Sequence, residues 1–367
     1  MRVIIAAAGT GGHINPGIAI ANKIKEKEKD SEIIFIGTQR GIENDLVPRA
    51  GYKLRTIDAY GISKKISLKT ISNNIKTIKG FAQAKKIIKE FKPDVVIGTG
   101  GYICGGPISA AHKLGIPTVI HESNAFPGVA VKVLSKKTDT VLVGFEDAKK
   151  RLPKAKNVVV TGTPTKVNKI DLTEEQKQTI KKQFKINNNL PVVTVFGGSQ
   201  GAESINKCFI DIINNKLNSD YQIIWAVGQK KYEEVRNSIK ELYNTAVVPY
   251  IYNMEEVLNL ADLVVSRSGA MTITEVAKCG KPAIFIPYPY ATENHQEYNA
   301  RVLANVDAAR IVLDKELSSE KLNKEIKNII TDKQKQVQMA KNAERIAIKD
   351  VNEKIYKEIE KLIKKST

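Results

Sequence analysis

Two glycine-rich turns, one in each half of the chain, constrain the fold more than any other feature. An apolar run at Val3–Ala7 leads into Gly9–His13 (GTGGH), and another at Val192–Phe196 leads into Gly197–Gly201 (GGSQG). Glycine lets the backbone take positive φ, and a helix that follows such a turn presents unpaired N–H groups and the positive end of its dipole. The pattern predicts two strand-turn-helix units suited to an anion. The alternative is that both segments are only tight turns between a strand and a helix.

Short apolar runs alternate with helical patterns along the whole chain, which predicts an α/β protein with two doubly wound, Rossmann-like domains facing a cleft. We expect domains at 1–163 and 164–340, a hinge at Gly162–Lys166, and a C-terminal helix over 341–367 that packs back on the first domain. The predicted strands are Val3–Ala7, Ile33–Ile36, Val95–Ile97, Thr118–Ile120, Val141–Val143, Val158–Val160, Val192–Phe196, Ile223–Val227, Ala246–Val248, Leu263–Val265, Ala283–Ile286 and Ala309–Val312.

The amino-acid composition argues against several classes of protein. The 367 residues are 42% hydrophobic, and no apolar run approaches the ~20 residues of a membrane-spanning helix. The three cysteines are far apart and lack metal-site spacing, which fits a reducing cytosol without disulfides or zinc. The net charge of +19 suits an anionic surface or a compositional bias, but the basic residues are mostly dispersed lysines. We therefore expect no binding to nucleic acid.

A second constellation follows the strand predicted at Leu263–Val265. A short Ser/Gly loop ends near Ala270, where a helix opens with free N–H groups at the carboxyl edge of the sheet. A diphosphate fits such a helix start, and Glu275, about one and a half turns further on, is placed to face a ribose diol. From residue type alone, Glu275 is equally a surface carboxylate favoured by the helix dipole.

Six motifs follow one another along the chain: Gly9–His13 with Pro16-Gly17, Gly98–Tyr102 with Gly105–Pro107, His121–Asn124, Gly197–Ala202, Ser266–Ala270 and His295-Gln296. Their order resembles that of the MurG-type N-acetylglucosaminyltransferases of peptidoglycan synthesis over essentially the whole chain. The resemblance implies the glycosyltransferase-B fold and inverting transfer of N-acetylglucosamine from UDP-GlcNAc to the C4 hydroxyl of undecaprenyl-pyrophosphoryl-MurNAc-pentapeptide, without metal or other cofactor. It also implies a peripheral protein on the cytoplasmic face of the cell membrane, with other proteins of cell-wall synthesis as partners.

By the same resemblance, the C-terminal domain binds the UDP-sugar and the N-terminal domain the acceptor. Lys166 stands where the family commonly has Arg, and Lys lacks the bidentate fork that Arg offers a phosphate. The implied substrate-binding residues are Thr10, Gly11, Gly12, Asn124, Lys166, Ser199, Gln200, Tyr250, Ile251, Ala270, Met271, Thr272, Glu275 and Gln296, and the implied acceptor-side residues are Gly100, Gly101, Tyr102, His121 and Glu122.

His13 is the candidate general base, because inverting transfer in one displacement needs the acceptor hydroxyl to lose its proton. The chain has only four histidines, and this one follows a glycine turn. The alternative is a structural or phosphate-binding imidazole. His121 and Glu122 likewise have a structural alternative, since they end the strand predicted at Thr118–Ile120.

A lysine-flanked helix predicted at Leu68–Phe91 is the candidate membrane-docking surface. Ile71, Ile75, Ile78 and Phe81 share one face by 3.6-residue spacing and would meet an anionic bilayer. The alternative is a break near Gly80 that turns both apolar stripes inward.

Two other functions share parts of this pattern. A nucleotide-sugar epimerase or a glycosyltransferase with a soluble acceptor would use the same fold and donor site. A non-enzymatic basic binding protein would not need two glycine turns.

Overall fold

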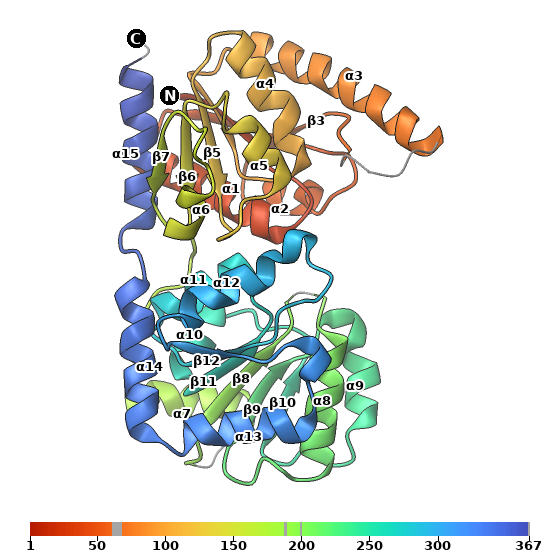
Figure 1. Ribbon diagram of the computed structural model, residues 1–367, viewed down its shortest axis with the longest axis vertical. Helices are drawn as coiled ribbons and strands as arrows, with labels where there is room; N and C mark the ends of the chain where they lie inside the picture. Colours follow the sequence, from red (N-terminus) through yellow and green to blue (C-terminus); the bar gives the residue numbers. More distant parts are fainter. Residues whose placement is uncertain (61–67, 187–188, 199, 366–367) are drawn as a thin grey trace. The chain divides into compact units, whose positions relative to one another are not determined.

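The chain forms two compact units in the computed structural model, which describes residues 1–60, 68–186, 189–198 and 200–365, with side chains described at all of these except 68–76. Unit 1 comprises Met1–Thr165 and Ile348–Thr367, and unit 2 comprises Lys166–Ala347 (Figure 1). The first division, between Thr165 and Lys166, lies inside the segment 162–166 that its sequence marks as a hinge.

Unit 1 is built on a parallel sheet with the strand order β3-β2-β1-β4-β5-β6-β7. The order reverses between β1 and β4, and open α/β sheets bind ligands beyond the carboxyl ends of strands at such a point. The strands are β1 (Arg2–Ala6), β2 (Glu32–Gly37), β3 (Lys53–Thr56), β4 (Val95–Gly98), β5 (Thr118–Glu122), β6 (Thr140–Val143) and β7 (Val158–Val160). The helices are α1 (Gly11–Lys27), α2 (Glu43–Arg49), α3 (Leu68–Phe91), α4 (Gly105–Lys113), α5 (Val129–Leu134), α6 (Glu146–Lys150) and α15 (Val351–Lys364), with a 3₁₀ turn at Tyr102–Cys104.

The apolar run of β1 explains why this strand is central. Val3 and Ile5 pack into one core with α1 and α15, whereas Ile4 and Ala6 pack into a second core with α3 and α4. All four side chains are fully buried. A strand covered on both faces needs apolar residues at every position, as parallel strands in α/β proteins do.

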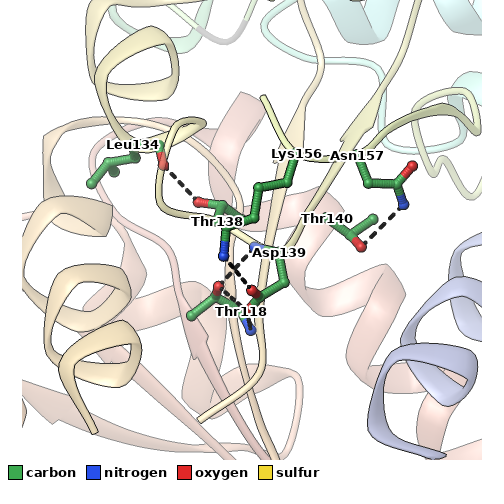
Figure 2. Close-up of polar contacts among 7 residues, drawn as sticks. All are labelled: Thr118, Leu134, Thr138, Asp139, Thr140, Lys156 and Asn157. Atoms are coloured by element: carbon green, nitrogen blue, oxygen red, sulfur yellow. Dashed lines mark hydrogen bonds and ion pairs between the residues drawn. The ribbon is translucent and has the colours of Figure 1, made fainter. Parts of the chain in front are cut away.

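A polar network fixes the amino ends of β5, β6 and β7 (Figure 2). The carboxylate of Asp139 accepts hydrogen bonds from the backbone N–H of Thr118 at 3.0 Å and from its hydroxyl at 2.8 Å, and it pairs with Lys156 at 3.0 Å. Burial alone would raise the pKa of Asp139, but the hydrogen bonds from Thr118 and the ion pair with Lys156 outweigh it and lower the pKa. Asp139 therefore stays ionised and holds β5 and β6 in register.

Helix α3 runs without interruption through Gly80, so the predicted alternative of a break there is wrong. A Cβ on Gly80 would lie 1.6 Å from the carbonyl oxygen of Asp58, which explains a glycine inside this helix. Ile87 and Ile88 are buried in the core of unit 1, and Phe81 packs against the same core. Among the described residues, none of the helices has the length and apolar character needed to cross a membrane.

Unit 2 repeats the topology with the parallel order β10-β9-β8-β11-β12-β13. Its core is centred on Trp225 and Phe209, whose rings lie 5.7 Å apart. The strands are β8 (Val192–Phe196), β9 (Gln222–Ala226), β10 (Thr245–Val248), β11 (Leu263–Ser266), β12 (Ala283–Phe285) and β13 (Ala309–Ile311). The helices are α7 (Glu174–Gln183), α8 (Glu203–Asn214), α9 (Tyr232–Ser238), α10 (Met254–Leu260), α11 (Ala270–Lys278), α12 (His295–Ala304), α13 (Ser319–Ile330) and α14 (Lys333–Ile346), with 3₁₀ turns at Gln229–Lys231, Thr292–Asn294 and Asp314–Glu316.

The C-terminal segment is not the single helix expected over 341–367. Helix α14 ends at Ile346 in unit 2, and α15 begins at Val351 in unit 1 after Asp350, whose φ of 55° is incompatible with a continuing helix. Helix α15 then packs on α1, where the hydroxyl of Tyr356 donates to the carboxylate of Glu28 at 3.0 Å. The chain thus enters unit 2 once and returns to unit 1 to complete its core.

Candidate functional site

The start of α1 lies at the reversal point of the unit 1 sheet. Gly9 has a φ of +94°, and α1 begins two residues later with a first turn that reads Gly-Gly-His-Ile. Within the described residues, the N-cap Thr10 makes no side-chain capping hydrogen bond, and both Thr10 and Gly12 are exposed. The turn therefore presents backbone N–H groups to an oxygen-rich ligand, as its sequence predicts.

The structure brings His13 against the predicted acceptor-side loop. A Cβ on Gly100 would lie 3.0 Å from Cδ2 of His13, and a Cβ on Gly101 would lie 3.1 Å from Nδ1. Both glycines also have positive φ, +99° and +78°. The hydroxyl of Thr99 donates to the carbonyl of His13 at 2.7 Å and joins the two segments. Tyr102, the next predicted residue, is 41% exposed.

The contact made by the His13 ring indicates its tautomer. Nδ1 lies 3.3 Å from the carbonyl oxygen of Ala8. A carbonyl can only accept, so this contact is favourable when Nδ1 carries the hydrogen. In the neutral ring, Nε2 then has the lone pair, which is the form a general base requires.

His121 and Glu122 are the last two residues of β5 and are buried, and Asn124 follows the strand. Nε2 of His121 donates to the carbonyl of Gly162 at 3.0 Å, and burial lowers the pKa of His121 to about 4. The carboxylate of Glu122 accepts from the backbone N–H groups of Asn124 and Gly128, both at 2.9 Å, and from the side-chain amide of Asn124 at 3.0 Å. This geometry favours the structural alternative for His121 and Glu122.

In unit 2, helix α11 has the exposed start that the sequence indicates. Its N-cap is Gly269, its first turn reads Ala-Met-Thr-Ile, and in the described part of the chain no side chain caps it. Met271, Thr272 and Glu275 are all partly exposed. The amides of the first turn and the Glu275 carboxylate therefore lie on the same short helix, as a diphosphate with its ribose would need.

Ser268 connects the start of α11 to the start of α12. The hydroxyl of Ser268 donates to the carbonyl of Gln296 at 2.8 Å. The side-chain amide of Asn299 donates to the backbone carbonyl of Ser268 at 3.2 Å. The side-chain oxygen of Gln296 accepts from the backbone N–H of Tyr288 at 3.0 Å. The predicted sugar-binding Gln296 thus lies beside the predicted diphosphate site.

The remaining predicted residues of unit 2 are more dispersed. Ile251 is buried and Tyr250 is 40% exposed after β10, which is separated from β11 by β9 and β8, or about 14 Å at the usual strand spacing. Gln200 is exposed in the second glycine turn, and Ser199 lies outside the described residues. Lys166 is exposed, and its carbonyl accepts from the side chain of Asn168 at 3.1 Å.

The roles of two residues next to the candidate sites, Arg267 and Glu43, were not predicted from the sequence. By residue type and position, Arg267 could be taken for a phosphate ligand. Its side chain is only 11% exposed, however, and it pairs with Asp314 at 3.0 Å and donates to the carbonyls of Ile286 and Pro287. It therefore braces the loop before α11. Glu43, in unit 1, holds the first glycine turn through the N–H of Gly9 at 3.1 Å. Its sequence signal is an acidic residue after a Gly-Thr loop that follows β2, the neighbour of β1.

Among the described residues, no group of three or more His, Cys, Asp or Glu side chains is arranged to hold a metal ion. Each unit offers backbone N–H groups as donors, at the start of α1 in unit 1 and at the start of α11 in unit 2. Two parallel α/β units with these helix starts match the class of two-domain proteins with the glycosyltransferase-B fold.

Comparison with known proteins narrows the class to a family. Residues 3–143 match the glycosyltransferase family 28 N-terminal domain and residues 192–355 the family 28 C-terminal domain. A relative from Acetivibrio thermocellus, named UDP-N-acetylglucosamine--N-acetylmuramyl-(pentapeptide) pyrophosphoryl-undecaprenol N-acetylglucosamine transferase, is 43% identical over 99% of both chains. The crystal structure of Acinetobacter baumannii MurG is 28% identical, with a TM-score of 0.78 over 98% of this chain and 99% of that one. The chain belongs to the MurG family of glycosyltransferase family 28.

A more distant likeness shows the fold alone. A UDP-GlcNAc 2-epimerase from Neisseria meningitidis, solved with UDP-GlcNAc bound, has a TM-score of 0.66 at 17% identity, covering 98% of this chain and all of its own.

Proposed function

We propose that this enzyme transfers N-acetylglucosamine from UDP-GlcNAc to the C4 hydroxyl of the MurNAc sugar in undecaprenyl-pyrophosphoryl-MurNAc-pentapeptide, with inversion at the anomeric carbon. The observation that carries the proposal is the 43% identity, over 99% of both chains, to a relative whose name gives this donor and this lipid-linked acceptor. The predicted residues in each unit agree with it: an imidazole with Nδ1 bonded in unit 1, and an open helix start followed by Glu275 in unit 2.

The chemistry assigns one role to each unit. Nε2 of His13 takes the proton from the C4 hydroxyl, which then attacks the anomeric carbon as the bond to UDP breaks. The amides of Ala270, Met271 and Thr272 hold the diphosphate and stabilise its growing charge. Losing one such preorganised donor costs roughly 2.7–4 kcal/mol in related oxyanion sites.

The other predicted residues bind rather than react. Glu275 binds the ribose diol, and Gln296 and Asn124 bind the hydroxyls of the transferred sugar. The turn at Thr10–Gly12 contributes to substrate binding, and the loop at Gly100–Tyr102, next to His13, binds the acceptor. Ser199, Gln200, Lys166 and the backbone of Ile251 beside Tyr250 complete the proposed donor contacts.

A lipid-linked acceptor requires the enzyme to reach a membrane, and we assign this docking to α3. Ile78 is 72% exposed on this helix, and Lys79 beside it is exposed. Phe81 contributes less than predicted, because it packs on the core and under Lys113, whose Nζ lies 5.0 Å from the ring centroid. The side chains of Ile71 and Ile75 lie outside the described residues. Docking would place the enzyme peripherally on the cytoplasmic face.

A turnover assay distinguishes this function from that of an epimerase or of a glycosyltransferase with a soluble acceptor. The purified enzyme is given UDP-GlcNAc with a short-chain lipid I analogue, or UDP-GlcNAc alone. We expect UDP release and a disaccharide product only when the analogue is present. Formation of the 2-epimer from UDP-GlcNAc alone would indicate an epimerase instead, and transfer to simple soluble sugars at the same rate would indicate a different acceptor.

A further inference from the structure

A buried carboxylate lies directly behind the catalytic turn of unit 1. Glu43 is fully buried at the start of α2, and a buried charge requires hydrogen-bond partners. One of its oxygens accepts from the backbone N–H of Thr38 at 3.0 Å and from the hydroxyl of Thr38 at 2.7 Å. The other accepts from the backbone N–H of Gly9 at 3.1 Å. A Cβ on Gly41 would lie 1.8 Å from this second oxygen, so the loop before α2 is shaped around the carboxylate.

The carboxylate is ionised at neutral pH. Burial by itself would raise the pKa of Glu43, but the hydrogen bonds from the Thr38 hydroxyl and from the N–H groups of Gly9 and Thr38 outweigh it and lower the pKa. Glu43 therefore places a fixed negative charge against the first glycine turn.

The N–H that Glu43 binds belongs to the same peptide unit as the carbonyl that His13 binds. The Gly9 nitrogen and the Ala8 carbonyl form one planar group, whose N–H and C=O point to opposite sides. Glu43 lies on the N–H side at 3.1 Å, and Nδ1 of His13 lies on the C=O side at 3.3 Å. The 3.3 Å contact is long, but catalytic hydrogen bonds are often long without substrate and shorten in the Michaelis complex.

We propose that Glu43 is a positioning residue for His13, acting through the Ala8–Gly9 peptide, an inference that rests on the proposed function. The charge polarises the peptide and makes the Ala8 carbonyl a stronger acceptor. That carbonyl holds the hydrogen on Nδ1, keeps the lone pair on Nε2, and stabilises the imidazolium that forms when Nε2 takes the proton from the acceptor hydroxyl. No proton crosses the peptide, and Glu43 stays ionised throughout.

The direct test is Glu43→Gln, which keeps the size of the side chain and removes its charge. We expect kcat to fall roughly 10–100-fold, the range found when outer-shell partners of metal-bound histidines are removed. The donor KM should change little, because most of the proposed donor contacts lie in unit 2. The acidic limb of the pH profile of kcat should move to lower pH, because the imidazolium loses its stabilising charge.

Thr38→Val is the matched control, since it removes one hydrogen bond from the same carboxylate but leaves its charge and the Gly9 contact. It should leave the acidic limb in place. In a His13→Ala background, Glu43→Gln should cause no further loss of kcat. An equal loss with and without His13, or an equal pH shift in Thr38→Val, would overturn the proposal.

The outcomes separate this inference from the proposed function. If His13→Ala lowers kcat by less than about tenfold, His13 is not the general base. If His13→Ala lowers kcat strongly but Glu43→Gln leaves kcat near normal, only the role proposed for Glu43 is refuted. If Glu43→Gln does not fold, ¹⁵N NMR of the unmodified enzyme still decides, with the His13 signal assigned from His13→Ala. We expect the Nδ1–H tautomer, and a resting Nε2–H tautomer would refute the inference.

Discussion

Two histidines of unit 1 have different environments, one suited to a structural role and the other to the proposed catalytic role. His121 is fully buried, donates from Nε2 to the carbonyl of Gly162, and accepts at Nδ1 from the hydroxyl of Ser123 at 3.4 Å. His13 is only partly buried and lies against the backbone of Gly100 and Gly101. His121 is near the carboxyl end of β5 and His13 follows the carboxyl end of β1, so sequence position alone does not distinguish them.

His121 should make the stability of unit 1 depend on pH. Burial lowers its pKa to about 4, whereas an unfolded histidine titrates near 6.5. Between these values the unfolded chain binds the extra proton, so the free energy of unfolding decreases as pH falls from about 6.5 to 4, by roughly 3 kcal/mol in total. His121→Gln retains a donor for Gly162 and cannot titrate.

Denaturant unfolding of both proteins at pH 7, 5.5 and 4.5 measures this contribution. We expect the unmodified protein to lose more stability than His121→Gln over that range. Parallel pH dependences would show that His121 is not the neutral buried group described here.

At the scale of elements, the sequence predicts the strands that are buried, but it does not predict an edge strand or a helix end that depends on tertiary contacts. The predicted strands are all present, because strands buried on both faces need continuous apolar runs. Strand β3 (Lys53–Thr56) was missed, since it is an edge strand whose side chains alternate between exposed and half-buried. The break between α14 and α15 was missed as well, because neither glycine nor proline marks it.

The Asp139 network should stabilise unit 1 through its hydrogen bonds more than through its ion pair. Asp139→Asn removes the charge that accepts from both groups of Thr118, and hydrogen bonds to a charged group contribute about 1.5–3 kcal/mol. Lys156→Ala removes an ion-pair partner that is 51% exposed, which contributes at most about 1 kcal/mol.

Unfolding free energies of the two variants at pH 7 check this order. The pKa of Asp139 is lowered in the folded protein, so its contribution is present above the unfolded pKa and is lost as pH falls through the folded one. The defect of Asp139→Asn should therefore shrink in acid. A larger defect in Lys156→Ala would contradict the assignment.

Helix α3 offers a test of membrane docking with described side chains. Lys79 and Lys86 are exposed and Lys85 is half-buried on this helix, so reversing all three to Glu should weaken binding to anionic vesicles and slow turnover of long-chain lipid I. Each such lysine contributes about 1 kcal/mol near an anionic surface. Turnover of a short-chain acceptor should stay near normal.

Reversal of Lys240, Lys324 and Lys333, which are exposed on unit 2, changes the net charge by the same amount and is the matched control. Vesicle sedimentation at low and high salt measures the difference. If both triple variants bind vesicles alike, the net charge of +19 rather than α3 governs attachment.

At the scale of the molecule, the proposed mechanism assigns different parts of the reaction to the two units. The glycine turns and the start of α11 were predictable, because backbone N–H groups at helix starts follow from sequence order. The links that hold them were not: Glu43 contacts Gly9 across 34 residues, and Ser268 contacts Gln296 across 28. Such contacts depend on which strands become neighbours, which a single sequence does not specify.

The central claim is that the base belongs to unit 1 and the donor site to unit 2. His13→Ala should lower kcat roughly 10²–10⁴-fold with little change in the KM for UDP-GlcNAc. Glu275→Ala should raise that KM about tenfold or more, because a hydrogen bond to a charged group contributes about 1.5–3 kcal/mol.

Measuring kcat and donor KM for this pair with the same short-chain acceptor is the most direct test. The account predicts that each substitution changes a different constant. It would be contradicted if His13→Ala mainly raised the KM for UDP-GlcNAc, or if Glu275→Ala left that KM unchanged.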